Sequence, residues 1–145
     1  MVDRRRARIL AMQGLCQLEV LGSDWLAQMD EFLADEGDSA AVQEYARGLV
    51  KGIWSELGVV DEPMQAASQH WDLKRMTVVD RNILRVAIRE LLNADSAVPP
   101  RVAVDEAIEI GKVFGSAESP AFINGVLDHV MKAVVPGAAL ATNQG

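Results

Sequence analysis

The sequence predicts an all-α fold, and three observations support this. Ala and Leu are abundant, alternating β-branched patterns are scarce, and residues that start and stop helices recur at regular intervals. Half of the 145 residues are hydrophobic, which argues against disorder and allows a sizeable core. We expect about seven helices in a single domain, residues 1–135, and a disordered tail, residues 136–145.

Capping residues define the first two helices. The first is expected over about residues 4–21, with Asp3 as its N-cap and Gly22 at its end. It is apolar on more than one side, which predicts a central position. Ser23 caps the second helix, which stops at Gly37.

The next two helices are expected to meet near Gly58. The third begins after Ser39 and keeps helical apolar spacing up to that glycine. The fourth is expected roughly over residues 61–71. Pro63 would then fall in its first turn, where proline is tolerated.

Three further helices are expected in the second half of the chain. Thr77 and Asp80 form a T-x-x-D pattern that resembles a capping box before the fifth helix. Pro99 and Pro100 lead into the sixth, and Gly115 is expected to end it in a left-handed conformation. Ser119 and Pro120 are expected as N-cap and first residue of the seventh.

A cluster of arginines marks the start of the first helix. Arg4, Arg5, Arg6 and Arg8 stand there in a chain with a formal net charge of −7. A helix N-terminus carries partial positive charge, so cations there cost stability. One interpretation is that they bind a phosphate backbone, since guanidinium groups match phosphate oxygens. The alternative is a solvated helix start that serves solubility. The acidic remainder argues against indiscriminate coating of nucleic acid.

A second row of arginines runs along the fifth helix. Arg81, Arg85 and Arg89 repeat every four residues and therefore share one face. This pattern is typical of a solvated face that pairs with acidic neighbours such as Asp80 and Glu90. The other interpretation is a basic strip for a phosphate backbone or an acidic partner.

No catalytic or metal-binding constellation can be assembled from the sequence. His70 and His129 lie in different helices, and Cys16 lies on an apolar face, which predicts an inert thiol. Carboxylates crowd the start of the sixth helix, where the helix dipole already favours anions. We therefore expect no enzyme, no cofactor, no metal site and no membrane span, in a cytoplasmic protein.

Three stretches resemble the NusB family of bacterial transcription antitermination factors. They are "RRRARILAMQGLCQLE", "VVDRNILRVAIREL" and "VPPRVAVDEAIEIGKVFGSAESPAFINGVLDHV". The resemblance covers nearly the whole chain. It implies two small helical bundles packed at an angle, with no catalysis. It also implies binding of boxA-type single-stranded RNA together with a small-subunit ribosomal protein of the NusE type, in support of RNA polymerase elongation complexes on ribosomal RNA operons.

The resemblance also assigns residues to surfaces. It places the RNA surface at Arg4, Arg5, Arg6, Arg8, Gln13, Glu118 and Phe122. It places Asp80 and Arg81 near the surface for the ribosomal protein, and we add Arg85 from the same helix face.

One departure from the family pattern bears on RNA affinity. Cys16 stands where relatives carry a tyrosine, which removes a flat face for base stacking. The alternative function is therefore a diverged protein-interaction module without strong RNA binding. A third interpretation is kinship to the NusB-like domain of some RNA cytosine methyltransferases. The absence of a following methyltransferase region argues against this interpretation.

Overall fold

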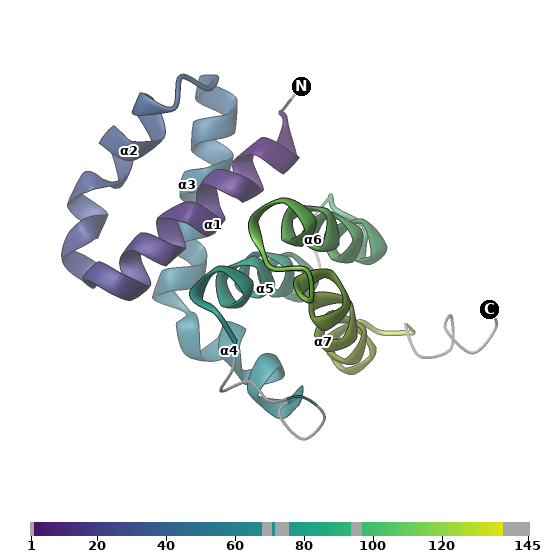
Figure 1. Ribbon diagram of the computed structural model, residues 1–145. Coiled ribbons are helices and arrows are strands. Elements are labelled where there is room, and N and C mark those ends of the chain that lie inside the picture. The colour runs from purple at the N-terminus through teal and green to yellow at the C-terminus, as the bar shows by residue number, and fades with distance from the viewer. Residues whose placement is uncertain (1, 68–70, 72–75, 94–96, 138–145) are drawn as a thin grey trace.

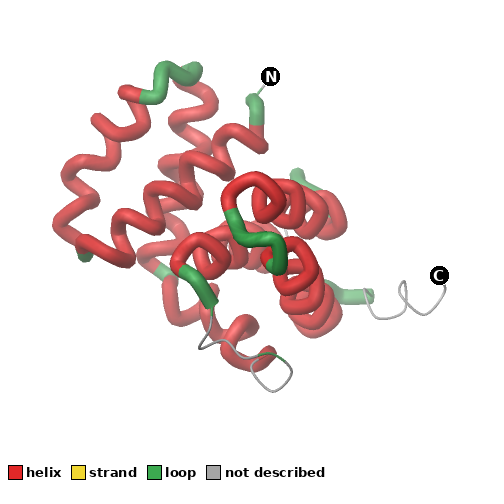
Figure 2. Tube along the Cα trace, in the orientation of Figure 1, coloured by secondary structure: helices red, strands yellow, loops and turns green. Residues whose placement is uncertain are grey.

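The computed structural model of the protein describes residues 2–67, 71, 76–93 and 97–137. In these residues the chain forms α-helices, one short 3₁₀ helix and no strand (Figure 2). The all-α prediction is confirmed. Of the expected tail, residues 138–145 lie outside the described residues.

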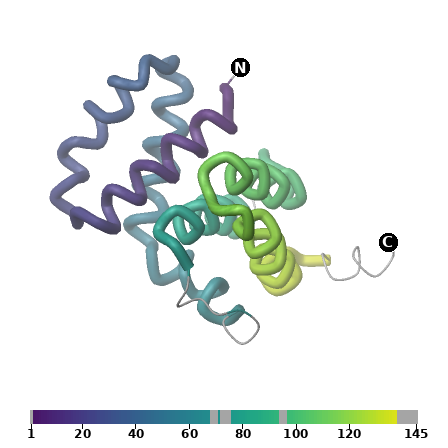
Figure 3. Tube along the Cα trace, in the orientation of Figure 1, coloured from purple at the N-terminus to yellow at the C-terminus, as the bar shows by residue number. Residues whose placement is uncertain are grey.

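The helices form two groups that meet at an angle (Figures 1 and 3). Helices α1 to α3 make up one group, and α4 to α7 make up the other, with α1 packed against both α3 and α5. The elements are α1 (Arg4–Leu21), η1 (Ser23–Gln28), α2 (Met29–Asp35), α3 (Ala40–Ser55), α4 (Leu57–Ala66), α5 (Val78–Leu92), α6 (Pro100–Phe114) and α7 (Ser119–Val134).

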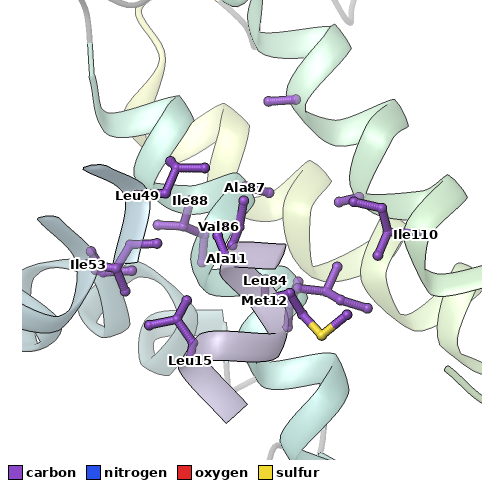
Figure 4. Packing of buried hydrophobic residues seen from close by; sticks show 14 of the residues in the cluster. Ala11, Met12, Leu15, Leu49, Ile53, Leu84, Val86, Ala87, Ile88 and Ile110 are labelled. Carbon is purple, nitrogen blue, oxygen red and sulfur yellow. The ribbon is translucent and has the colours of Figure 1, made fainter. Parts of the chain in front are cut away.

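One hydrophobic core runs through both groups. Figure 4 shows Leu15 of α1, Ile53 of α3 and Leu84 and Ile88 of α5 within it, and all four are completely buried. Full burial of each such side chain contributes about 1.5–3 kcal/mol. Because α5 contacts α1, α3, α4, α6 and α7, it fixes the positions of these five helices.

Three of the expected N-caps are confirmed. Each side-chain oxygen accepts a hydrogen bond from the backbone N–H three residues later, at 3.0–3.2 Å. These caps are Asp3 for α1, Ser39 for α3 and Thr77 for α5.

The prediction of one continuous second helix is wrong. The chain forms the 3₁₀ helix η1 and then α2, and Ser23 makes no capping bond. The N–H of Trp25 donates to the carbonyl of Gly22, a tight turn that places the buried Trp25 ring beside Gly14 of α1. Tight 3₁₀ turns are common connectors where the chain must reverse quickly.

The expected boundary between the third and fourth helices is also wrong. Helix α3 ends at Ser55, and α4 begins at Leu57, so Gly58 lies inside α4 and Pro63 lies beyond its first turn. Tertiary contacts override the local signals here, because Val60 and Met64 of α4 are both buried.

The link between α6 and α7 differs from the prediction in two details. Gly115 has φ −91° and ψ −169°, an extended and not a left-handed conformation. Ser119 is the first residue of α7, and its Oγ accepts a hydrogen bond from the N–H of Ser116 at 2.9 Å. A Cβ on Gly115 would lie only 2.5 Å from the Cβ of Ser119, so close approach explains the glycine.

Candidate RNA and partner surfaces

The arginine cluster lies at the exposed start of α1, and its members differ in their surroundings. Arg4 and Arg5 are exposed, Arg6 is partly buried and Arg8 is buried. We refer to Arg4, Arg5 and Arg6 as the arginine end. The guanidinium of Arg4 lies over the ring of Tyr45, 5.6 Å from its centroid, a cation–π contact that leaves its donors open to other groups.

Arg5 forms an exposed ion pair with α6, and Arg6 forms a partly buried ion pair with the loop before α3. The Nε of Arg5 donates to Glu106 of α6 at 2.6 Å, and that of Arg6 donates to Asp38 at 3.0 Å. Arg6 also reaches Glu36. The exposed Arg5–Glu106 pair contributes about 0–1 kcal/mol, so a phosphate group can compete for the guanidinium of Arg5, whereas the Nε of Arg6 contacts both oxygens of a partly buried Asp38.

Arg8 is held differently. Its Nε and Nη2 donate to the two carboxylate oxygens of Glu90 at 2.8 and 3.1 Å, and the two side chains are only 5% and 3% exposed. The hydroxyl of Tyr45 donates to the same carboxylate at 2.8 Å. Removing one partner of a buried pair costs about 3–5 kcal/mol, so Arg8 is a structural residue in this fold.

A groove of about 460 Å³ lies between the starts of α1 and α6. Arg4, Arg5 and Arg8 line it together with the apolar residues Val2, Val98, Pro99 and Val102, and the carboxylates of Asp3 and Glu106 also belong to its lining. Two helix N-termini meet at this groove, and each carries partial positive charge. The groove therefore combines cationic donors with apolar side chains and two carboxylates.

The arginine row on α5 is tied to neighbouring helices. Arg85 is buried and donates to Asp61 of α4 at 2.9 Å and to Glu19 of α1 at 2.7 Å. Arg81 donates to Glu19 at 2.7 Å, and Arg89 pairs with Glu56 at 3.4 Å. The interpretation as a solvated face that pairs with Asp80 and Glu90 is therefore wrong, because the acidic partners come from α1, from α4 and from the junction of α3 and α4. The sequence alone predicts an exposed face for this row of arginines, because the helices that bury it, α1 and α4, lie elsewhere in the chain.

Asp80, Glu118 and Phe122 lie together around a second cavity, of about 310 Å³. It is formed by the starts of α5 and α7 and by Trp71 and Met76. Asp80 is 6% exposed, and its Oδ1 accepts no hydrogen bond from the described residues. The second half of the expected capping box therefore does not form. We call this feature the Asp80 cavity.

The structure separates the expected RNA residues into two places. Arg5 contacts Glu106 in the middle of α6, whereas Glu118 and Phe122 follow its end. At 1.5 Å per residue, Glu106 lies roughly 12 Å from the end of α6. Gln13 is partly buried on α1, about two turns after Arg6.

Cys16 is partly buried beside the start of α5. Its Sγ lies 3.6 Å from the side-chain nitrogen of Asn82, and burial raises the pKa of the thiol. A raised pKa lowers the fraction of reactive thiolate, which agrees with an inert side chain.

No group of three or more His, Cys, Asp or Glu side chains among the described residues is arranged to hold a metal ion. None of the helices in the described part is long and apolar enough to cross a membrane.

Comparison with known proteins decides the family. The family model for NusB matches residues 5–132. The chain belongs to the NusB family. It is 43% identical over 134 residues to the transcription antitermination protein NusB of Anaeromyxobacter dehalogenans strain 2CP-1, covering 92% of this chain and 93% of that protein.

Solved structures agree with this assignment. The T. maritima NusB structure superposes with a TM-score of 0.79 at 34% identity and covers 97% of this chain and 99% of that one. A structure described as antitermination factors NusB and NusE in complex with dsRNA gives a TM-score of 0.77 at 24% identity, covering 90% and 96%, which supports the fold. The predicted NusB fold is thereby confirmed.

Proposed function

We propose that this NusB-family chain binds boxA-type single-stranded RNA together with a small-subunit ribosomal protein of the NusE type. The observation that carries the proposal is the arginine end. It places Arg4 and Arg5 on the surface with Arg6 partly buried beside them. Arg4 packs over the ring of Tyr45, and the exposed ion pair of Arg5 is weak enough to be exchanged for a phosphate. The NusB–NusE–dsRNA structure supports the choice of partners.

The cellular role follows from the same proposal. The pair would join RNA polymerase elongation complexes and support read-through in ribosomal RNA operons. Since the chain carries a net charge of −7, binding must rely on this local cationic region and not on the whole surface. Arg8 is left out of the RNA contacts because Glu90 holds it in the core.

The alternative, a protein-interaction module without strong RNA binding, also has an observation in its favour. Carboxylates of the chain itself already neutralise Arg5 and Arg6. If RNA phosphates cannot displace them, the arginine end only stabilises the fold.

A binding titration separates the two functions. Fluorescence anisotropy with a boxA-like oligoribonucleotide is measured with and without the ribosomal protein, for the wild type and for Arg4→Ala/Arg5→Ala/Arg6→Ala. We expect the partner to strengthen binding and the triple variant to lose at least tenfold in affinity. The matched control, Arg47→Ala/Lys51→Ala/Lys132→Ala, removes the same charge elsewhere and should bind like the wild type.

The outcomes are distinct. If the triple variant binds RNA as well as the wild type, the RNA proposal is wrong. If no form binds RNA but all bind the ribosomal protein, the interaction module is correct. A read-through assay with RNA polymerase then tests the cellular role, in which the triple variant should fail to support elongation past a terminator.

A further inference from the structure

Arg4 differs from the other two arginines of the arginine end in what surrounds its charge. Arg5 and Arg6 each pair with carboxylates of the chain, whereas no carboxylate of the described residues forms an ion pair with Arg4. Its guanidinium lies instead over the ring of Tyr45, 5.6 Å from the ring centroid. An aromatic ring attracts a cation without neutralising it. The charge of Arg4 is therefore available to an incoming phosphate.

The ring of Tyr45 is itself held in place by the buried ion pair between α1 and α5. Its hydroxyl donates to Glu90 at 2.8 Å, and the same carboxylate accepts both hydrogen bonds of Arg8. Arg4 and Arg8 lie one turn apart on the same face of α1, so Tyr45 of α3 spans that turn. Hydrogen bonds to an ionised group are strong, and they fix the ring relative to the core.

A fixed ring under Arg4 bears on the affinity for a phosphate. A long side chain that is free in solution loses rotamer freedom when it binds, and this loss weakens binding. A guanidinium that already rests on a fixed ring loses less freedom when the phosphate arrives. The ring can therefore strengthen RNA binding without contacting RNA.

We propose that Tyr45 is a positioning residue for RNA binding, because its ring holds Arg4 in place for a phosphate. The inference rests on the proposed function and adds to it a residue of α3. It also ranks the arginines. Arg4→Ala should weaken RNA binding more than Arg6→Ala, since the Nε of Arg6 contacts both oxygens of Asp38.

A double-mutant cycle between Tyr45 and Arg4 tests the inference. Affinity for the boxA-like oligoribonucleotide is measured by anisotropy at one salt concentration for the wild type, Tyr45→Leu, Arg4→Ala and the double variant. We expect Tyr45→Leu to weaken binding about two- to tenfold, the range expected for the ordering of one long side chain. In the Arg4→Ala background the same substitution should change the affinity by less than about twofold.

Further variants separate the effect on Arg4 from an effect on stability. Tyr45→Phe keeps the ring and should restore most of the affinity that Tyr45→Leu loses. The matched control, Phe32→Leu, removes another partly buried ring, which packs against Trp25 with 5.4 Å between centroids, and should bind RNA like the wild type. Thermal unfolding shows which variants are folded during the titration, and Tyr45→Met repeats the cycle if Tyr45→Leu is unfolded.

Three outcomes would overturn the inference. Tyr45→Leu could bind RNA as tightly as the wild type, it could lose the same affinity with and without Arg4, or Tyr45→Phe could lose as much as Tyr45→Leu. In each case, binding that still depends on Arg4, Arg5 and Arg6 leaves the proposed function standing. A wild type that binds no RNA refutes both.

Discussion

Arg8 and Glu90 form a buried, two-pronged ion pair between the start of α1 and the end of α5. The two hydrogen bonds are 2.8 and 3.1 Å long, and neither side chain is more than 5% exposed. The pair joins the two helical groups. It also distinguishes Arg8 from Arg5, which is 54% exposed three residues earlier.

This difference predicts contrasting costs in stability. Arg8→Ala leaves a buried carboxylate unpaired and should lower the free energy of unfolding by about 3–5 kcal/mol. Arg5→Ala removes an exposed pair and should cost less than about 1 kcal/mol. Urea unfolding measures both. Arg8→Met/Glu90→Leu, which removes both charges, should recover much of the loss. Equal small effects of Arg8→Ala and Arg5→Ala would contradict the structural role.

Two glycine substitutions should act in opposite directions. In Gly115→Ala the new Cβ would lie 2.5 Å from the Cβ of Ser119 and 2.9 Å from the carbonyl of Gly111, so the α6–α7 link must shift, at a cost of about 1–3 kcal/mol. In Gly48→Ala, inside α3, the Cβ meets nothing within 4 Å. Better helix propensity should stabilise that variant by about 0.5–1 kcal/mol. Thermal unfolding measures the stability change of both variants. A Gly115→Ala protein as stable as the wild type would show that the contact between residue 115 and Ser119 is not rigid.

Tyr45 should make stability depend on pH in the alkaline range. Burial, with the hydrogen bond to Glu90, raises the pKa of Tyr45 to about 12, whereas an unfolded tyrosine titrates near 10. The folded state therefore holds this proton more tightly. Its contribution to stability is complete below about pH 10 and declines as the pH rises towards 12.

The matched variant is Tyr45→Phe, which lacks the ionisable hydroxyl. The difference in unfolding free energy between the wild type and this variant should shrink from pH 9 to pH 12 in urea titrations. A difference that stays constant over this range would mean that the hydroxyl does not titrate with a raised pKa.

The helices could be predicted from sequence because their signals are local. Asp3, Ser39 and Thr77 each cap a helix through a backbone group three residues away, within the reach of a sequence pattern. The start of α4 could not be predicted, because the burial of Val60 and Met64 against other helices outweighs the signals from Gly58 and Pro63.

The site residues likewise divide into those that local sequence signals predict and those that depend on tertiary contacts. The exposed arginine end follows from charge and position alone. Glu90 and Glu106 were missed as partners because they lie 82 and 101 residues away from Arg8 and Arg5. One signal could have identified Arg8: it precedes Met12 and Leu15 at helical spacing and so lies on the apolar face of α1. The unpaired Asp80 oxygen has no sequence signal, since it depends on how α5 and α7 meet.

The salt dependence of RNA binding tests the central claim, that the arginine end binds phosphates, most directly. For a single strand, the slope of log K against log salt concentration changes by about 0.7 for each phosphate neutralised. The slope for Arg4→Ala/Arg5→Ala/Arg6→Ala should therefore be shallower than that of the wild type by up to about 2, while Arg47→Ala/Lys51→Ala/Lys132→Ala keeps the wild-type slope. Identical slopes for the wild type and the arginine-end variant would contradict the claim.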